Sequence, residues 1–125
     1  MSRIRSKNTQ AERIVFSFLR QEGVHFKKHY KDIVGCPDIA LPEKKKAVFV
    51  DGDFWHGRDF ERVKRGRKKT DYWVEKIKSN IERDKKQRAS LRRKGWAVIK
   101  VWESDIKRKR TRLKQLKKIK SFLAL

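Results

Sequence analysis

Apolar positions near the start of the chain recur at helical spacing and predict a helix that begins near Ala11 and ends at Gly23. Its apolar face is formed by Ile14, Val15, Phe18 and Leu19. Asn8 or Thr9 can cap the first turn, and the glycine is a natural stop. The residues before this helix, 1–9, are polar and basic and are expected to form an arm.

Three strands are predicted after this helix. The first is Val24–Tyr30, in which apolar and polar residues alternate. Turn residues at Gly35–Pro37 lead into a short apolar strand, Asp38–Leu41. A hairpin-like link then leads to a buried strand, Ala47–Val50, and the glycine within Asp51–Asp53 lets the chain turn sharply at its end.

The second half of the chain begins with a long, basic and unpatterned segment, Gly57–Thr70, which reads as a loop that a partner orders. Spacing and alternation then predict a helix over Asp71–Lys94, a strand over Trp96–Trp102 and a basic amphipathic helix over Asp105–Leu125. The tryptophans expected in the core are Trp73, Trp96 and Trp102.

The order helix, three strands, helix, strand, helix predicts an α/β fold with a mixed central sheet flanked by helices. A length of 125 residues is usual for one compact domain, so residues 1–125 are expected to form a single domain. No apolar run approaches about 20 residues, and no membrane span is expected. The single cysteine, Cys36, suits a reducing cytosol and excludes a cysteine-based zinc cage.

The chain is strongly basic, with a formal net charge of +22 from 37 Lys and Arg against 15 Asp and Glu. Such an excess repels itself unless a polyanion neutralises it, so nucleic acid is the expected partner. An anionic membrane surface is the weaker alternative, because no basic amphipathic helix with an aromatic anchor face stands out. On charge alone, a structural RNA-binding protein is a competing interpretation.

Two acidic positions at strand ends are candidates for metal chemistry. Hydrolysis of a phosphodiester needs a divalent cation, and Mg²⁺ prefers oxygen ligands. Adjacent strands can bring Asp38 together with the backbone of Val50 and the carboxylate of Asp51. Asp51 either adds a ligand or closes the turn. The alternative for Asp38 is a turn or capping role, which the local sequence alone favours.

Phe54, Trp55 and His56 directly follow the Asp-Gly-Asp turn. Aromatic side chains can wedge between base steps or stack on unpaired bases, and a histidine can serve as a general acid or base near pH 7. The alternative is that the aromatics close the end of the core and that His56 is a surface residue.

Asn80, Arg83 and Asp84 lie three and four residues apart on the long predicted helix and share a face. Arg83 and Asn80 are candidates for DNA contact, and Asp84 for orienting His56. The alternative is a charged helix face in contact with solvent, and the local sequence alone favours this alternative.

Glu12 can stabilise a helix N-terminus or support a metal-bound water. His25 and His29 share a face of a predicted strand without evident partner ligands, so we interpret them as surface or half-buried residues.

Six segments resemble the very-short-patch-repair (Vsr) endonuclease family, a branch of the restriction-endonuclease-like PD-(D/E)xK fold. They are SRIRSKNT, AER, GCPDIALP, AVFVDGDFWHG, KTDYWVEKIKSNIERD and GWAVIKVWE. They follow the family's order and cover nearly the whole chain up to Glu103. The stretches FVDGDFWHG and YWVEKIKSNIERD are the most specific.

The resemblance implies a role for each matching position. Asp38 matches the catalytic aspartate that binds the metal, and Val50 matches the residue whose main-chain carbonyl helps to hold it. His56 matches the catalytic histidine, which acts on the attacking water. Glu12 and Asp84 match the outer carboxylates of the site.

Phe54 and Trp55 match aromatics that stack into DNA at a mismatched base pair. In well-known members this pair is a thymine–guanine mismatch left by deamination of 5-methylcytosine, and the nick falls on the thymine strand. Many members also hold a structural zinc, bound by residues near the FWH segment and after the VWE strand. In this sequence Asp53, Arg58 and Ser104 stand at those places, so zinc is not expected, and the Gly57 loop must be held in another way.

These features favour an Mg²⁺-dependent endonuclease that nicks double-stranded DNA at T:G mismatches in very short patch repair. Basic loop residues, Lys68 and Lys69 among them, would grip phosphates. The alternatives are a homing- or restriction-type nuclease on matched DNA, and an inactive DNA- or RNA-binding module. We expect a monomer in the prokaryotic cytoplasm, at the nucleoid, with repair proteins as possible further partners.

Overall fold

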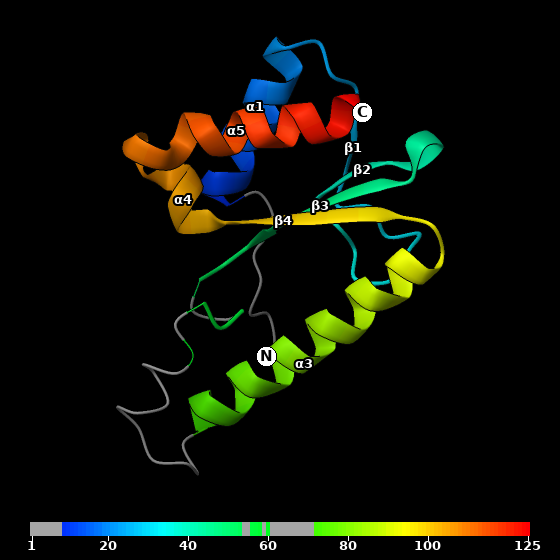
Figure 1. The fold of residues 1–125 in the computed structure, drawn as a ribbon. Helices are drawn as coiled ribbons and strands as arrows, with labels where there is room; N and C mark the ends of the chain where they lie inside the picture. The colour runs from blue at the N-terminus through cyan, green and yellow to red at the C-terminus, as the bar shows by residue number, and fades with distance from the viewer. Residues whose placement is uncertain (1–8, 54–55, 59, 61–71) are drawn as a thin grey trace.

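The computed structural model describes residues 9–53, 56–58, 60 and 72–125 (Figure 1). A mixed sheet lies between two helical layers, so the predicted α/β fold is confirmed. The elements, in chain order, are α1 (Gln10–Gln21), β1 (Lys27–Lys28), β2 (Ile39–Leu41), the 3-10 helix η1 (Pro42–Lys44), β3 (Lys46–Asp51), α3 (Tyr72–Arg93), β4 (Ala97–Trp102), α4 (Glu103–Lys107) and α5 (Lys109–Ala124).

The sheet has the order β1-β2-β3-β4. The pairs β1–β2 and β2–β3 are antiparallel, and β3 runs parallel to β4. The parallel pair ends with Asp51 opposite Trp102, so the carboxyl ends of both strands meet at one edge of the sheet. Every residue of β3 is buried, which makes it the central strand of the molecule.

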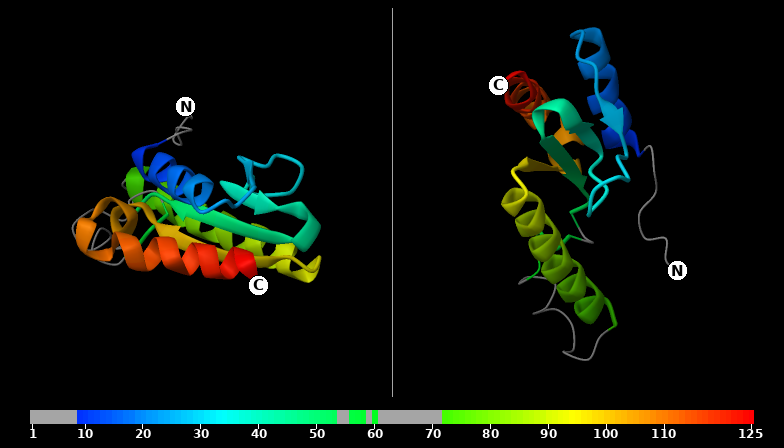
Figure 2. Two further views of the ribbon diagram at one scale, coloured as in Figure 1. Left: turned by 90° about the horizontal axis from the view of Figure 1, so that it is seen from above. Right: turned by 90° about the vertical axis from the view of Figure 1, so that its right-hand side faces the viewer.

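Helices cover both faces of the sheet, with α1, α4 and α5 on one side and α3 on the other (Figures 1 and 2). The larger core cluster lies on the first side and includes Leu19 of α1, Val48 of β3 and Ile119 of α5. A smaller cluster on the second side joins Phe49 of β3 to Leu91 of α3. Alternate residues of β3 thus enter different cores, as the period of a strand requires.

The first helix forms as its sequence predicts. The Thr9 side chain accepts a hydrogen bond from the Glu12 N–H at 3.2 Å and caps the N-terminus. Gly23 follows the helix with φ of +77°, a backbone conformation that glycine adopts without strain. Within the described ranges, no helix is long and apolar enough to cross a bilayer.

Two predicted elements are wrong in extent. The strand predicted over Val24–Tyr30 pairs only at Lys27–Lys28, and it ends there because the backbone turns left-handed at His29, with φ of +45°. The helix predicted over Asp105–Leu125 is two helices, since Arg108 is extended between α4 and α5.

The core position predicted for Trp73 is also wrong. Its side chain is 39% exposed and meets Tyr72 edge-on, with 4.9 Å between ring centroids. Val74 and Ile77 form the buried face at this end of α3, and Trp73 lies beside that face rather than on it. Trp96 and Trp102 are half-buried.

Removal of a core side chain tests this packing. Leu19→Ala is expected to lower the free energy of unfolding by about 2–5 kcal/mol, because Leu19 is fully buried between α1 and the sheet. Leu113→Ala, on an exposed position of α5, serves as the control and is expected to change it by less than about 0.5 kcal/mol. Equal losses in urea unfolding would contradict the placement of the core.

Candidate active site

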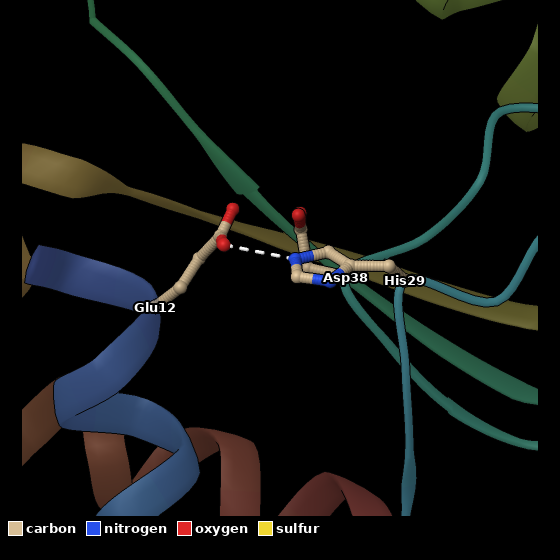
Figure 3. A group of neighbouring side chains, drawn as sticks. All are labelled: Glu12, His29 and Asp38. Carbon is tan, nitrogen blue, oxygen red and sulfur yellow. Dashed lines mark hydrogen bonds and ion pairs between the residues drawn. The ribbon is translucent and has the colours of Figure 1, made fainter. Parts of the chain in front are cut away.

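Glu12, His29 and Asp38 form a first group of polar side chains, which we call the α1-side group (Figure 3). They come from α1, from the turn after β1 and from the residue before β2. Glu12 and Asp38 are 2% and 0% exposed. One ligand atom of each residue lies within 4.8 Å of the others, and Glu12 Oε1 is 2.9 Å from His29 Nε2. The three residues could hold a metal ion.

The sheet register explains how this group is assembled. Lys28 pairs with Ile39, so the next pair in register is His29 with Asp38, and the His29 N–H donates to the Asp38 carbonyl at 3.0 Å. The Asp38 carboxylate in turn accepts a hydrogen bond from the Val50 N–H at 2.7 Å. Asp38 and the Val50 backbone therefore meet, as the sequence predicts.

Asp51, His56 and Asp84 form a second group, which we call the α3-side group. His56 Nδ1 is 2.5 Å from Asp84 Oδ2 and 3.8 Å from Asp51 Oδ1. Arg88 donates to both carboxylate oxygens of Asp51, at 2.7 and 2.9 Å. This fork-to-fork contact is the strongest geometry for an arginine–carboxylate pair. Asp51 thus faces a guanidinium rather than the α1-side group.

The contact with Asp84 indicates which nitrogen of the His56 ring carries a proton. Burial by itself would raise the pKa of Asp84, but the hydrogen bond from His56 and the charges of His56, Arg88 and Arg83 hold it below its usual 3.8. An ionised carboxylate only accepts hydrogen bonds, so His56 Nδ1 carries a proton. In the neutral ring, Nε2 is then the atom that can take a proton from water.

A pocket of about 480 Å³ is lined by residues from both groups. Its walls include His29 and His56, one histidine from each group, together with three cationic side chains, Lys31, Arg83 and Arg88. A pocket that combines proton acceptors with several cations suits a phosphate group.

A polar network, made by Asp53, Arg58, Ser104 and Asp105, ties the segment that carries His56 to the start of α4. Ser104 donates to Asp53 through its N–H at 3.0 Å and its hydroxyl at 2.5 Å. Arg58 Nη1 contacts Asp53 at 3.2 Å and Asp105 at 3.1 Å. Burial by itself would raise the pKa of Asp53, but the hydrogen bonds from Ser104 and Arg58 lower it.

The other predicted site residues fall in different places. Arg83 is 52% exposed and lines the pocket, as a phosphate contact requires. Asn80 is 3% exposed, so the structure places it beneath the surface rather than on a face that DNA can reach. The remaining residues predicted to contact DNA lie outside the described residues; they are Phe54, Trp55, Lys68 and Lys69.

Sequence reasoning missed two members of the site. The residues that His29 meets in the site, Glu12 and Asp38, come from α1 and from the residue before β2 rather than from its own strand. A hairpin pairing of residues 29 and 38 is the signal that could have found it. Arg88 follows Asp84 by one helical turn, and that spacing gives no hint of its contact with Asp51.

The fold and these two groups define an α/β protein with buried carboxylates and histidines around a cationic pocket. The family described as "DNA mismatch endonuclease Vsr" matches residues 1–62. The chain is 40% identical over 106 residues to the type II nicking enzyme V.XorIIP of Xanthomonas oryzae pv. oryzae, across 85% of this chain and 78% of the relative.

Two further relatives agree with this match. The type II nicking enzyme V.NmeAIP of Neisseria meningitidis is 41% identical over 119 residues, which is 93% of this chain and 85% of the relative. The DNA mismatch endonuclease Vsr of Escherichia coli is 32% identical over 107 residues, 86% and 69% of the two chains. The chain therefore belongs to the Vsr family. It is a DNA endonuclease with the restriction-endonuclease-like fold, and DNA is its partner.

Gly57 allows a test of how closely the His56 turn must pack on α3. A Cβ there would lie 2.3 Å from Ile81 Cδ1 and 2.7 Å from Ile81 Cγ1, at φ of +75°. Gly57→Ala is expected to displace the turn and to slow single-turnover DNA cleavage by about 100-fold. Gly57→Ala with Ile81→Ala removes both clashing atoms and is expected to recover part of this loss.

Gly23→Ala is the matched control, because Gly23 has φ of +77° but nothing within 4 Å of the added Cβ. It is expected to cost stability through backbone strain and to leave the cleavage rate of the folded enzyme unchanged. A Gly57→Ala enzyme that cleaves at the unmodified rate would contradict the close packing of the turn.

The lowered pKa of Asp84 predicts a specific dependence of stability on pH. A carboxylate whose pKa is lower in the folded chain contributes its full stabilisation above its unfolded pKa, near 3.8, and loses it as pH falls through the folded value. The difference in unfolding free energy between the natural chain and Asp84→Asn should therefore shrink as pH falls below about 4.

Urea unfolding from pH 2 to pH 7 measures this difference. Glu82→Gln, an exposed neighbour on α3, is the control and should keep the acid limb of the natural chain. A difference that stays constant over the whole range would show that the Asp84–His56 contact does not carry the effect.

Proposed function

We propose that this endonuclease hydrolyses one strand of duplex DNA in a metal-dependent reaction, and that its target is a thymine–guanine mismatch. The proposal is carried by one observation: the Val50 N–H binds the Asp38 carboxylate, and the next residue, Asp51, belongs to the α3-side group. Two groups with different chemistry thus lie on either side of one point on β3.

The α1-side group fits a divalent cation. Glu12 and Asp38 are both buried, and two buried carboxylates close together repel each other unless a proton or a cation lies between them. We propose that Asp38 and the Val50 carbonyl hold Mg²⁺ or a similar ion, with Glu12 beside them. When bound, such an ion polarises the phosphate and activates water.

The α3-side group supplies the proton acceptor. In the proposed reaction, His56 Nε2 takes a proton from the attacking water, and the Asp84 carboxylate at Nδ1 stabilises the imidazolium that forms. Asp51 is paired with Arg88, so we propose that it acts on His56 and on this guanidinium rather than on the ion. Arg83, at the rim of the pocket, binds the DNA phosphate.

The choice of target rests on the relatives and on the sequence beside His56. Two of the relatives above are named nicking enzymes, which favours the cleavage of one strand. A third is named a mismatch endonuclease. Phe54 and Trp55 immediately precede His56, and we propose that they stack into the DNA at the mismatched pair.

A strand-resolved cleavage assay tests this function. With Mg²⁺ present, the enzyme is expected to nick a thymine–guanine duplex and to leave its matched counterpart intact. Asp38→Ala is expected to slow nicking by at least about 1,000-fold, since it removes a carboxylate that holds the ion and with it several kcal/mol of transition-state stabilisation. Glu43→Ala removes one negative charge at an exposed position of η1 and should nick at the natural rate.

Each other outcome has a definite meaning. Equal cleavage of matched and mismatched duplexes would replace the mismatch target with a restriction- or homing-type one. Cleavage by Asp38→Ala at the natural rate would contradict the assignment of the ion to Asp38.

A further inference from the structure

His29 has a left-handed backbone conformation. Its φ is +45°, a region that residues other than glycine enter only at a cost, and its side chain is mostly buried. The left-handed turn ends β1 and still keeps the His29 N–H on the Asp38 carbonyl. Strain of this kind persists where the surroundings fix the residue, and it is frequent at functional positions.

The imidazole ring is held from two directions. Its Nε2 atom is 2.9 Å from Glu12 Oε1. Phe16, one turn along α1 from Glu12, meets the ring at 80° with 5.7 Å between centroids. The Nε2 atom therefore points toward the Glu12 carboxylate, and the Asp38 carboxylate lies close by, as Figure 3 shows.

The distances in this group suit ligands of one ion. Metal–oxygen and metal–nitrogen distances of about 2.1 Å place two neighbouring ligands of an octahedral ion about 3 Å apart, and opposite ligands about 4.2 Å apart. Glu12 Oε1 and His29 Nε2 are 2.9 Å apart, as neighbouring ligands are, and one ligand atom of each of the three residues lies within 4.8 Å of the others.

The α3-side group is the poorer site for a divalent cation. Arg88 already supplies a positive charge at 2.7 and 2.9 Å from Asp51 and at 4.0 Å from Asp84. This fixed charge repels a second cation at that place.

We propose that His29 is a nitrogen ligand of the divalent cation at Glu12 and Asp38, and that it shifts the preference of the site from Mg²⁺ toward Mn²⁺ and Co²⁺. An imidazole binds first-row transition-metal ions well, whereas Mg²⁺ prefers oxygen ligands. This inference rests on the proposed metal-dependent function, but it concerns which ion binds rather than which DNA is cut.

Direct binding of Mn²⁺ and Mg²⁺ to the full chain without DNA, by calorimetry and by electron paramagnetic resonance of Mn²⁺, tests this role. His29→Ala is expected to weaken Mn²⁺ binding about 10- to 100-fold and to change Mg²⁺ binding much less. His29→Gln keeps a hydrogen-bond donor for Glu12 and offers an oxygen, so it should lower the ratio of Mn²⁺ to Mg²⁺ affinity by at least about 10-fold.

Two control variants separate the possible failures. His25→Ala changes an exposed histidine four residues away and should bind both ions as the natural chain does. Asp38→Ala should lose binding of both ions. If Asp38→Ala loses both while His29→Ala and His29→Gln keep the natural Mn²⁺ affinity, His29 is only a partner of Glu12 and the inference is overturned, while the proposed function stands.

If Asp38→Ala also binds Mn²⁺ and Mg²⁺ as the natural chain does, the cation is not held at Asp38, and the proposed function fails together with the inference. Urea unfolding of each variant shows whether it is folded. His29→Gln carries the test if His29→Ala does not fold.

Discussion

The hydrogen bond from the Val50 N–H to the Asp38 carboxylate, 2.7 Å long, is the contact on which the arrangement of the site depends. β3 is buried along its whole length between two helical layers, so its backbone cannot shift without disturbing both cores. Asp38 is fixed to this backbone, and the next residue, Asp51, begins the α3-side group. One buried strand therefore sets the spacing between the proposed cation ligands and the proposed proton acceptor.

The two groups deal with buried charge in different ways. On the α3 side, Arg88 pairs with Asp51, and His56 donates to Asp84, so each carboxylate has a cationic or polar partner from the chain itself. On the α1 side, Asp38 accepts a hydrogen bond from the Val50 N–H, and Glu12 contacts the His29 ring. In the proposed function this group binds an ion from solution, whereas the fixed charge of Arg88 repels an ion from the α3-side group.

The fold could be predicted because its elements follow simple periods. The apolar face of α1 and the continuous apolar run of β3 identified both elements, and the meeting of Asp38 with Val50 followed from the hairpin between their strands. What could not be predicted depends on single backbone conformations, such as the left-handed turn at His29 and the extended residue Arg108. The periodic pattern of apolar residues, which predicts helices and strands, carries no information on either conformation.

Binding and cleavage make opposite demands on this chain. A net charge of +22 attracts the DNA backbone, whereas the carboxylates of Glu12 and Asp38 repel any phosphate that approaches them. Lys31, Arg83 and Arg88 line the pocket. In the proposed reaction these cationic side chains bind the phosphate, and a cation at the α1-side group offsets the repulsion that the two carboxylates exert on it. Binding then depends on the fixed charge of the chain, whereas cleavage depends on the cation as well.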